Sequence, residues 1–299
     1  MAVEDWPTTF GYPLLLYPLV KWLYGPADVF IEHGHRLYAS GIGLLTIAAM
    51  VVTWIYEPRR WVRVLSVVAL AAVIGQGLLG GLRVIEDEVL LAKIHGCVGP
   101  LFFAICAAWA TVTSKRWQQR GEVLESRFAA SIQRLALLTT VVAYFQLVLG
   151  AQLRHLPITM TPTAFRTTLI IHLFVAAVLT LHIVALAVLA WIPQRQDRWV
   201  RRPATLLAAL MAMQLLLGAG TWITKYGYPD WVADPFGWAG YTVLAEGPAQ
   251  VLITTTHVAI GTLILIVSLV TALRSFRVLR QAPRSSAVAA PLLAMGVVA

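Results

Sequence analysis

The stretch Glu32-His33-Gly34-His35-Arg36 stands where a polar N-terminal segment meets the first long apolar run of the chain. If a helix has begun by Glu32, the side chains of Glu32, His35 and Arg36 fall at positions i, i+3 and i+4 and share a face. Ionisable groups at the mouth of an apolar helix are costly, so they indicate a functional site. His33 falls on a different face, and we expect it to point to the surface.

The composition of the chain is that of a membrane protein. Of its 299 residues, 59% are hydrophobic and 12% charged, and the mean hydropathy is +0.75; in soluble domains about a quarter of residues are charged. The net charge of +9 would indicate nucleic acid binding in a soluble protein. Because the basic and aromatic residues here flank apolar runs, we expect contact with membrane lipid and no nucleic acid partner.

Seven apolar runs are each long enough to cross a bilayer core of about 30 Å. They cover residues 37–56, 61–82, 89–113, 133–153, 167–192, 204–224 and 250–273. The predicted fold class is therefore an all-α polytopic membrane protein with seven transmembrane helices. Cys97 and Cys106 lie in one run, about 13 Å apart along a helix, so they cannot form a disulfide with each other.

The basic residues predict the orientation. Most of the 23 Lys and Arg residues lie in linkers on one side of the membrane, which the positive-inside rule makes cytoplasmic. The N-terminal segment and the loop 225–249 are then outside, where the aromatic loop either caps the helices or anchors them in the interface. The basic residues on the cytoplasmic side are Arg59, Arg60, Arg63, Lys115, Arg116, Arg120, Arg127, Arg134, Arg195, Arg198, Arg201, Arg202, Arg274, Arg277, Arg280 and Arg284.

Three helices that run from inside to outside end alike. Each carries the pattern Q-x-x-L-G, at residues 76–80, 146–150 and 214–218, and each is followed by a helix with a histidine in its outer half. Small residues let helices approach closely, and such repetition indicates duplicated half-bundles, although glycine-rich packing faces can also look alike by chance. We predict an extracytoplasmic segment 1–31, half-bundles 32–120 and 121–280, and a cytoplasmic tail 281–299 without an assigned role.

Four histidines recur early on the helices that run from outside to inside: His35, His95, His172 and His257. A lone intramembrane histidine is best explained as a hydrogen bond between helices. Four of them at matched depth, two in each half, favour two pairs of axial haem ligands, because neutral imidazole suits iron. His155 lies at an outer helix end, either solvated or at a haem edge, and we interpret His182 as structural.

Each of the other polar residues near this depth has two possible roles. Haem carries propionates, for which Arg and Lys are fitting partners, but the same residues could be anchors that extend to the interface. Glu32 could take up a proton or position water beside a haem, or it could simply pair with Arg36. The candidate propionate contacts are Arg36, Arg83, Arg154, Arg166 and Lys225.

With E-x-x-H-R, the three Q-x-x-L-G helices and the three later histidines, the chain resembles the haem A synthase (CtaA/Cox15-type) family over about residues 4 to 275. The resemblance implies eight helices in two four-helix halves. It also implies an oxidoreductase of cytochrome oxidase assembly that converts the C8 methyl group of haem O, through a hydroxymethyl stage, to the formyl group of haem A. The chain begins inside the first outer loop of that pattern, so the first helix of the family is absent from it. Either this absence is a real truncation with a short N-terminal tail outside, or a helix lies upstream of Met1, and we favour the second.

The resemblance assigns roles residue by residue. His35 and His95 would ligate the substrate haem, His172 and His257 the iron of a haem b cofactor, and Glu32 would be the catalytic carboxylate. It implies a bacterial plasma (inner) membrane protein with haem sites toward the extracytoplasmic face, together with haem O synthase and an electron-transfer protein as partners. Two alternatives remain open: a non-catalytic di-haem cytochrome b, which would not need Glu32, and a haem transport or assembly protein.

Overall fold

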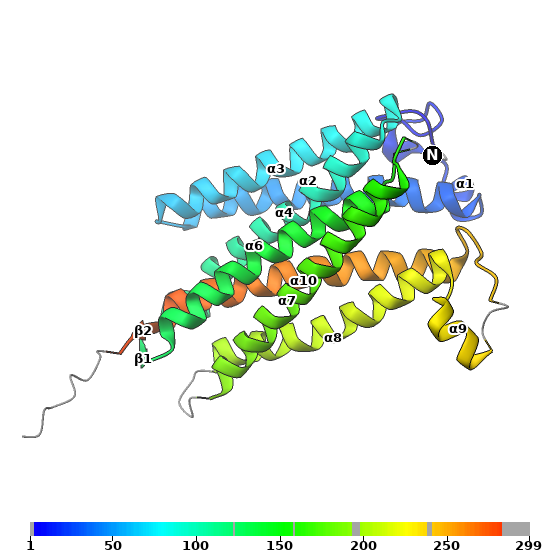
Figure 1. Ribbon diagram of the computed structural model, residues 1–299. Helices are drawn as coiled ribbons and strands as arrows, with labels where there is room; N and C mark the ends of the chain where they lie inside the picture. Colours follow the sequence, from blue (N-terminus) through cyan, green and yellow to red (C-terminus); the bar gives the residue numbers. More distant parts are fainter. Residues whose placement is uncertain (1–2, 122, 158, 193–197, 238–240, 283–299) are drawn as a thin grey trace, which may run out of the picture.

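The computed structural model of the protein describes residues 3–121, 123–157, 159–192, 198–237 and 241–282. Within them, seven helices are long and apolar enough to cross a membrane, and they run side by side (Figure 1). This confirms the predicted all-α polytopic membrane fold. The seven are α2 (Ala27–Tyr56), α3 (Arg60–Glu86), α4 (Val89–Thr113), α6 (Ala129–Arg154), α7 (Pro162–Trp191), α8 (Arg198–Tyr226) and α10 (Pro248–Val278).

The first long helix starts earlier than its apolar run. Pro26 precedes α2, which begins at Ala27 and therefore includes the whole stretch from Glu32 to Arg36. Proline at a helix start is favourable because its missing N–H would have no intrahelical partner there. Before it come a short 3₁₀ helix, η1 (Leu14–Leu16), and a short helix, α1 (Leu19–Leu23), both of which contact α2.

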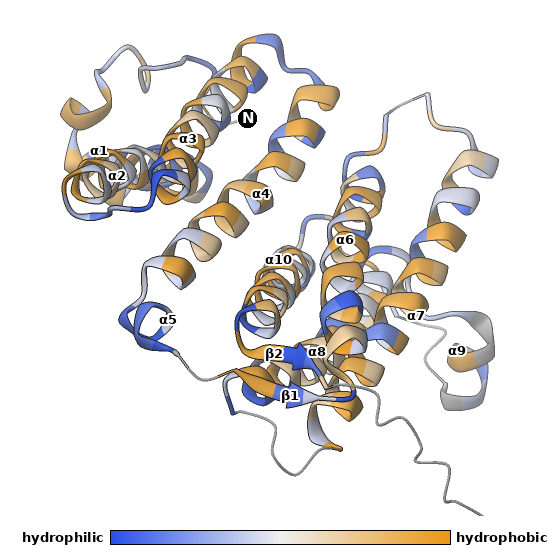
Figure 2. Ribbon diagram, turned by 90° about the vertical axis from the view of Figure 1, so that its left-hand side faces the viewer, coloured by the Kyte–Doolittle hydropathy of each residue, from blue (hydrophilic) through white to orange (hydrophobic). Residues whose placement is uncertain are grey.

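The helices fall into two groups (Figure 2). In the first, α3 packs between α2 and α4 around a small core of Val62, Ala69, Trp109 and Val112. In the second, α7 and α10 each pack against both α6 and α8, so α7 and α10 occupy opposite corners of a four-helix bundle. Helix α4 contacts α6 and α10 and thereby joins the groups. The exact division of the chain at residues 120 and 121 stays a prediction.

The second bundle has the larger core. Four of its helices each contribute a fully covered aliphatic side chain, from Ile132, Ile183, Leu207 and Ile264. The polar residues buried on α10 donate their hydroxyl hydrogens to carbonyls of their own helix, as Ser268 does to Leu265 at 2.8 Å. Hydroxyls bonded in this way cost little in a water-free interior, so the buried hydroxyls of α10 do not weaken the core of this bundle.

A short sheet ties the linker between the groups to the end of the last helix. Strands β1 (Leu124–Ser126) and β2 (Leu279–Gln281) pair in parallel, with Leu124 opposite Leu279. The Gln133 amide reinforces this junction by donating to the carbonyl of Leu279 at 3.0 Å. The sequence predicted no strand here. Residues 283–299, most of the predicted tail, lie outside the described residues.

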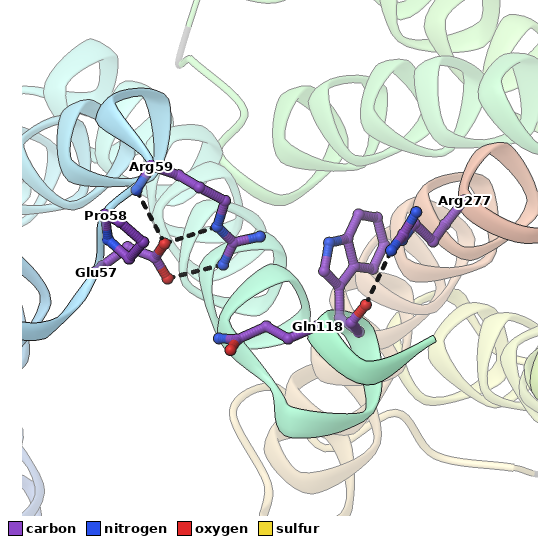
Figure 3. Close-up of a pocket in the computed structure, with 6 residues that line it drawn as sticks. Glu57, Pro58, Arg59, Gln118 and Arg277 are labelled. Atoms are coloured by element: carbon purple, nitrogen blue, oxygen red, sulfur yellow. Dashed lines mark hydrogen bonds and ion pairs between the residues drawn. The ribbon is translucent and has the colours of Figure 1, made fainter. Parts of the chain in front are cut away.

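The same end of the molecule has a cavity of about 500 Å³ between the groups (Figure 3). Glu57 and Arg59, from the turn between α2 and α3, form an ion pair of 2.7 Å on one side of it. On the other side, Arg277 of α10 donates to the carbonyl of Arg120, which follows helix α5 (Lys115–Gln119), at 2.8 Å. These contacts hold the helix ends together at the end opposite the four early histidines.

Candidate functional site

Arg36 fastens the N-terminal segment to the start of α2. Its Nη1 donates to the carbonyl of Asp5 at 2.8 Å and its Nη2 to the carbonyl of Val3 at 3.2 Å. Nη2 also pairs with Glu32 Oε1 at 3.1 Å, and Glu32 Oε2 accepts the N–H of Val3 at 3.3 Å. The i, i+4 pair that the sequence allowed is therefore formed. Its two side chains keep only 10% (Arg36) and 21% (Glu32) of their surface exposed.

The expectation that His33 faces the surface was wrong. Its side chain is 1% exposed, with Nδ1 2.9 Å from Thr9 Oγ1. The rings of Tyr17 and Trp22 lie against it, with centroids at 4.8 and 5.4 Å. The N-terminal segment folds back over this face of α2, and the periodicity of one helix cannot reveal such a cover.

The N-terminal segment has its own internal order. The Asp5 carboxylate accepts the backbone N–H groups of Phe10 at 2.9 Å and Gly11 at 2.8 Å. Burial alone would raise the pKa of Asp5, but these hydrogen bonds, with that from Thr8, hold the pKa below its usual value. Gly11 has φ +77°, a backbone conformation that suits glycine. The segment therefore lies as a fixed cover beside Glu32.

The first pair of predicted ligands lies together. His35 of α2 and His95 of α4 face one another with ring centroids 6.3 Å apart and planes inclined by 69°. His35 is exposed and His95 half-buried on the bare protein surface. Glu32 lies close enough to His35 to act on it electrostatically. Two imidazoles and a carboxylate thus gather at one end of the first helix group.

The Q-x-x-L-G motif of α3 supports His95 directly. The Gln76 amide donates to the backbone carbonyl of His95 at 2.9 Å. One turn later Gly80 lies against the imidazole, and a Cβ on that glycine would be 3.0 Å from Cε1 of the ring. Gly99 of α4 in turn leaves room for the glutamine, since a Cβ there would be 3.1 Å from Gln76 Nε2. The motif therefore positions the histidine of the next helix.

The second motif repeats this arrangement in the second bundle. The Gln146 amide donates to the carbonyl of His172 at 3.0 Å and lies 3.2 Å from its Nε2. Gly150 lies against the ring, where a Cβ would be 3.5 Å from Cε1. The same pairing of glutamine, glycine and imidazole thus occurs between α6 and α7.

The third motif faces α10. Gln214 Nε2 lies 3.4 Å from Nε2 of His257, and a Cβ on Gly218 would be 3.3 Å from Cε1 of that ring. His172 and His257 come from opposite corners of the bundle and are close enough to interact electrostatically. The sequence predicted a close-packing motif repeated between two half-bundles, and it did not show that the glutamines of this motif contact the histidines.

The residues present fit a haem group held by two imidazoles. Nδ1 of His95, His172 and His257 is buried without a hydrogen-bond partner among the described residues. In that part of the chain, no three or more His, Cys, Asp or Glu side chains are arranged so that they could together hold a metal ion. Paired imidazoles with a free ring nitrogen and no third protein ligand suit an iron porphyrin, whose other four ligands come from the ring itself.

The candidate propionate contacts are placed differently from one another. Arg83 and Arg154 are electrostatic neighbours near the outer ends of α3 and α6, and Lys225 of α8 is a neighbour of Arg154. The guanidinium of Arg36 is occupied by backbone carbonyls, as described above. Arg166 is exposed in the first turn of α7. A propionate role for each stays a prediction.

The remaining sequence features are less central. Nδ1 of His182 lies 2.8 Å from the carbonyl of Val178, one turn earlier in its own helix, in keeping with a structural role. In the loop after α8, which includes helix α9 (Asp230–Phe236), the rings of Tyr228 and Tyr241 lie 5.2 Å apart. The two cysteines are unpaired and half-buried.

Two known proteins are similar to this chain over part of its length. Haem A synthase from Shouchella clausii is 27% identical over 169 residues, which are 54% of this chain and 52% of that protein. Haem A synthase from an Exiguobacterium species is 25% identical over 242 residues, which are 76% of this chain and 75% of that protein. The chain thus spans about half of the first relative and three quarters of the second. No solved structure matches significantly.

The family comparison covers most of the chain. The COX15-CtaA family, described as cytochrome oxidase assembly protein, matches residues 25–233. The matched region contains the stretch from Glu32 to Arg36, all three Q-x-x-L-G motifs and three of the four paired histidines. This multi-pass membrane protein therefore belongs to the COX15-CtaA family of cytochrome oxidase assembly proteins.

Proposed function

We propose that the protein is a haem A synthase, which oxidises the C8 methyl group of haem O to a formyl group through a hydroxymethyl intermediate. The observation that carries this proposal is the pairing of His35 and His95 at 6.3 Å with a carboxylate, Glu32, one turn away on the same helix. Family membership and the two haem A synthase relatives support it.

The first helix group is the proposed substrate site. His35 of α2 and His95 of α4 bind the iron of haem O and thereby hold the macrocycle at this end of the first helix group. Gln76 and Gly80 fix the position of His95, so the orientation of the substrate is set by α3. Such fixed positioning of His95 matters because a small misplacement of a reacting group greatly lowers the rate of the chemical step.

Glu32 is the proposed catalytic carboxylate. Oxidation of a methyl group with water as the oxygen source releases protons and electrons at each of the two stages, so a proton acceptor is needed. Glu32 is held by Arg36 and by the backbone N–H of Val3, an arrangement that fixes its direction while one fifth of its surface stays exposed. A positioned carboxylate contributes about 10²- to 10⁴-fold as a general base.

The second bundle is the proposed site of a haem b cofactor, held by His172 and His257. When bound, this group supplies a one-electron carrier that takes electrons from substrate oxidation. Gln146 and Gln214 keep the two imidazoles in position from α6 and α8. We propose that both sites lie toward the extracytoplasmic face of a bacterial inner membrane, and that haem O synthase and an electron-transfer protein are partners.

A pigment analysis tests the proposal. The chain is expressed in a host that makes haem O but no haem A, and the extracted haems are separated by chromatography. Haem A or its hydroxymethyl precursor is the expected product. Haem b alone would instead indicate the electron carrier without catalysis, and the absence of any haem would contradict the assignment of all four histidines.

Substitution of the carboxylate sharpens this test. Glu32→Gln keeps an acceptor for Arg36 but cannot take up a proton, so product formation should fall by about 100-fold or more while haem b stays bound. Asp28→Asn is the matched control, because Asp28 lies one turn earlier on the same helix and, among the described residues, accepts a hydrogen bond from its own neighbour, Val29, alone. Equal product from both variants would rule out Glu32 as the catalytic group.

A further inference from the structure

Five basic groups gather where the outer ends of the two helix groups meet. Two come from the first group of helices and three from the second. Lys93 Nζ donates to Gln152 Oε1 at 3.1 Å, which joins α4 to α6 at this level. The five, called the seam cluster below, are Arg83, Lys93, Arg154, His155 and Lys225.

The members of the seam cluster act on one another. Burial lowers the pKa of His155, and the positive charges of the other four members lower it further. Arg83 is in addition an electrostatic neighbour of both His35 and His95. The cluster therefore reaches from the first ligand pair into the second helix group.

No carboxylate of the described residues forms an ion pair with the seam cluster. Among the described residues the ion pairs are Glu32–Arg36 and Glu57–Arg59, and neither involves the cluster. The acids nearest to it in sequence, at residues 86 to 88, are exposed and form neither of these ion pairs. The Nε atom of Arg83 is buried and has no hydrogen-bond partner among the described residues. Like charges in a partly buried site repel strongly, so the cluster requires anions from elsewhere.

We propose that the seam cluster is a single carboxylate-binding site shared by the two halves. It takes the acid groups of the porphyrin held by His35 and His95 together with those of the porphyrin held by His172 and His257. The inference rests on the proposed function, and it adds Lys93 and His155 to the groups that contact substrate and cofactor.

A carboxylate-binding site shared by two porphyrins couples their binding unfavourably. Carboxylates that arrive from one porphyrin lower the positive potential felt by the other, so each weakens the binding of its partner by the same factor. Added negative charge also stabilises ferric over ferrous iron. Binding of substrate at the first pair therefore lowers the reduction potential of the haem at the second.

The test uses zinc protoporphyrin and its dimethyl ester, which differ only in their acid groups. Binding to the purified full-length protein in lipid nanodiscs is followed by porphyrin fluorescence, with empty nanodiscs as background. We expect about tenfold tighter binding of the acid than of the ester. Arg83→Gln combined with Lys225→Gln should abolish this preference. Lys21→Gln, an exposed charge at the same end but outside the cluster, should keep it.

A second readout addresses the coupling. Spectroelectrochemical titration of the resident haem should give a lower midpoint potential with the acid probe than with the ester, and the double variant should lose the difference. Equal affinities for the two probes, or an unchanged preference in the double variant, would overturn the shared site. A chain that makes no haem A but keeps the preference for the acid would refute only the proposed function.

Discussion

The three motif glycines allow one prediction to be worked out in detail, because they differ in how closely they approach the imidazole. A Cβ would lie 3.0 Å from the ring at Gly80, 3.3 Å at Gly218 and 3.5 Å at Gly150. Exchange of a helical glycine for alanine gains about 0.5–1 kcal/mol from the reduced entropy of the unfolded chain. Overpacking a rigid neighbour costs about 1–3 kcal/mol.

The entropy gain and the overpacking cost together predict an order of stability for the three Gly→Ala variants. Gly150→Ala makes an ordinary contact, so it should be neutral or stabilise by up to about 1 kcal/mol. Gly218→Ala requires a shift of a few tenths of an ångström and should be close to neutral in stability, with weaker retention of haem b. Gly80→Ala must displace the ring of His95, which its own backbone bond to Gln76 holds in place, and should destabilise by about 1–2 kcal/mol.

The assay is thermal unfolding in detergent combined with the haem content of the purified protein. Gly150→Ala and Gly218→Ala form a matched pair because they act on the two ligands of one proposed haem. Equal haem content in both, together with a Gly80→Ala variant as stable as the parent protein, would refute the view that the motif is fitted to the histidine.

Three further predictions concern other parts of the molecule. His172→Ala or His257→Ala should each remove the haem b spectrum; a full haem b complement in either variant would exclude that residue as a ligand. Gly81→Ala should displace the indole of Trp6, against which Gly81 packs, and limited proteolysis should then cut the N-terminal segment faster than in the parent protein. Hydrogen bonds from Arg59, aided by nearby positive charge, hold the pKa of Glu57 below its usual value despite burial. The Glu57–Arg59 pair therefore stabilises the folded protein, by about 1 kcal/mol, and this contribution is fully present above the ordinary glutamate pKa. That contribution is lost as the pH falls through the lowered value. The acid side of the unfolding profile should therefore flatten in Glu57→Gln, and an unchanged profile would contradict the pair.

The sequence predicts the helices well because each must carry enough apolar residues to cross a bilayer by itself. This information is local, and all seven runs became helices. The E-x-x-H-R stretch was also readable, since a helix fixes the spacing of Glu32 and Arg36 and their pair is formed. The start of α2 at Ala27 could not be predicted, because the first turns of this helix lie outside the apolar run.

Contacts between distant parts of the chain could not be predicted in this way. His33 is covered by residues of the N-terminal segment, and nothing in the spacing of one helix shows which face another segment will cover. The motif glutamines were visible as a repeat, but their bonds to the next helix depend on how neighbouring helices align. The seam cluster likewise requires four helix ends to meet, and no sequence pattern indicates that Lys93 belongs to it.

The parallel pairing of β1 with β2 brings together the two ends of the chain segment that forms the second bundle. The strand that leads into α6 lies beside the strand that follows α10, at the register of Leu124 and Leu279. The chain thus enters and leaves this bundle at one point, as it does in domains that tolerate insertion into a host protein. The segment around α5 is the connection between this bundle and the first helix group. A cut in that connection would leave the second bundle with its ends still fastened to each other.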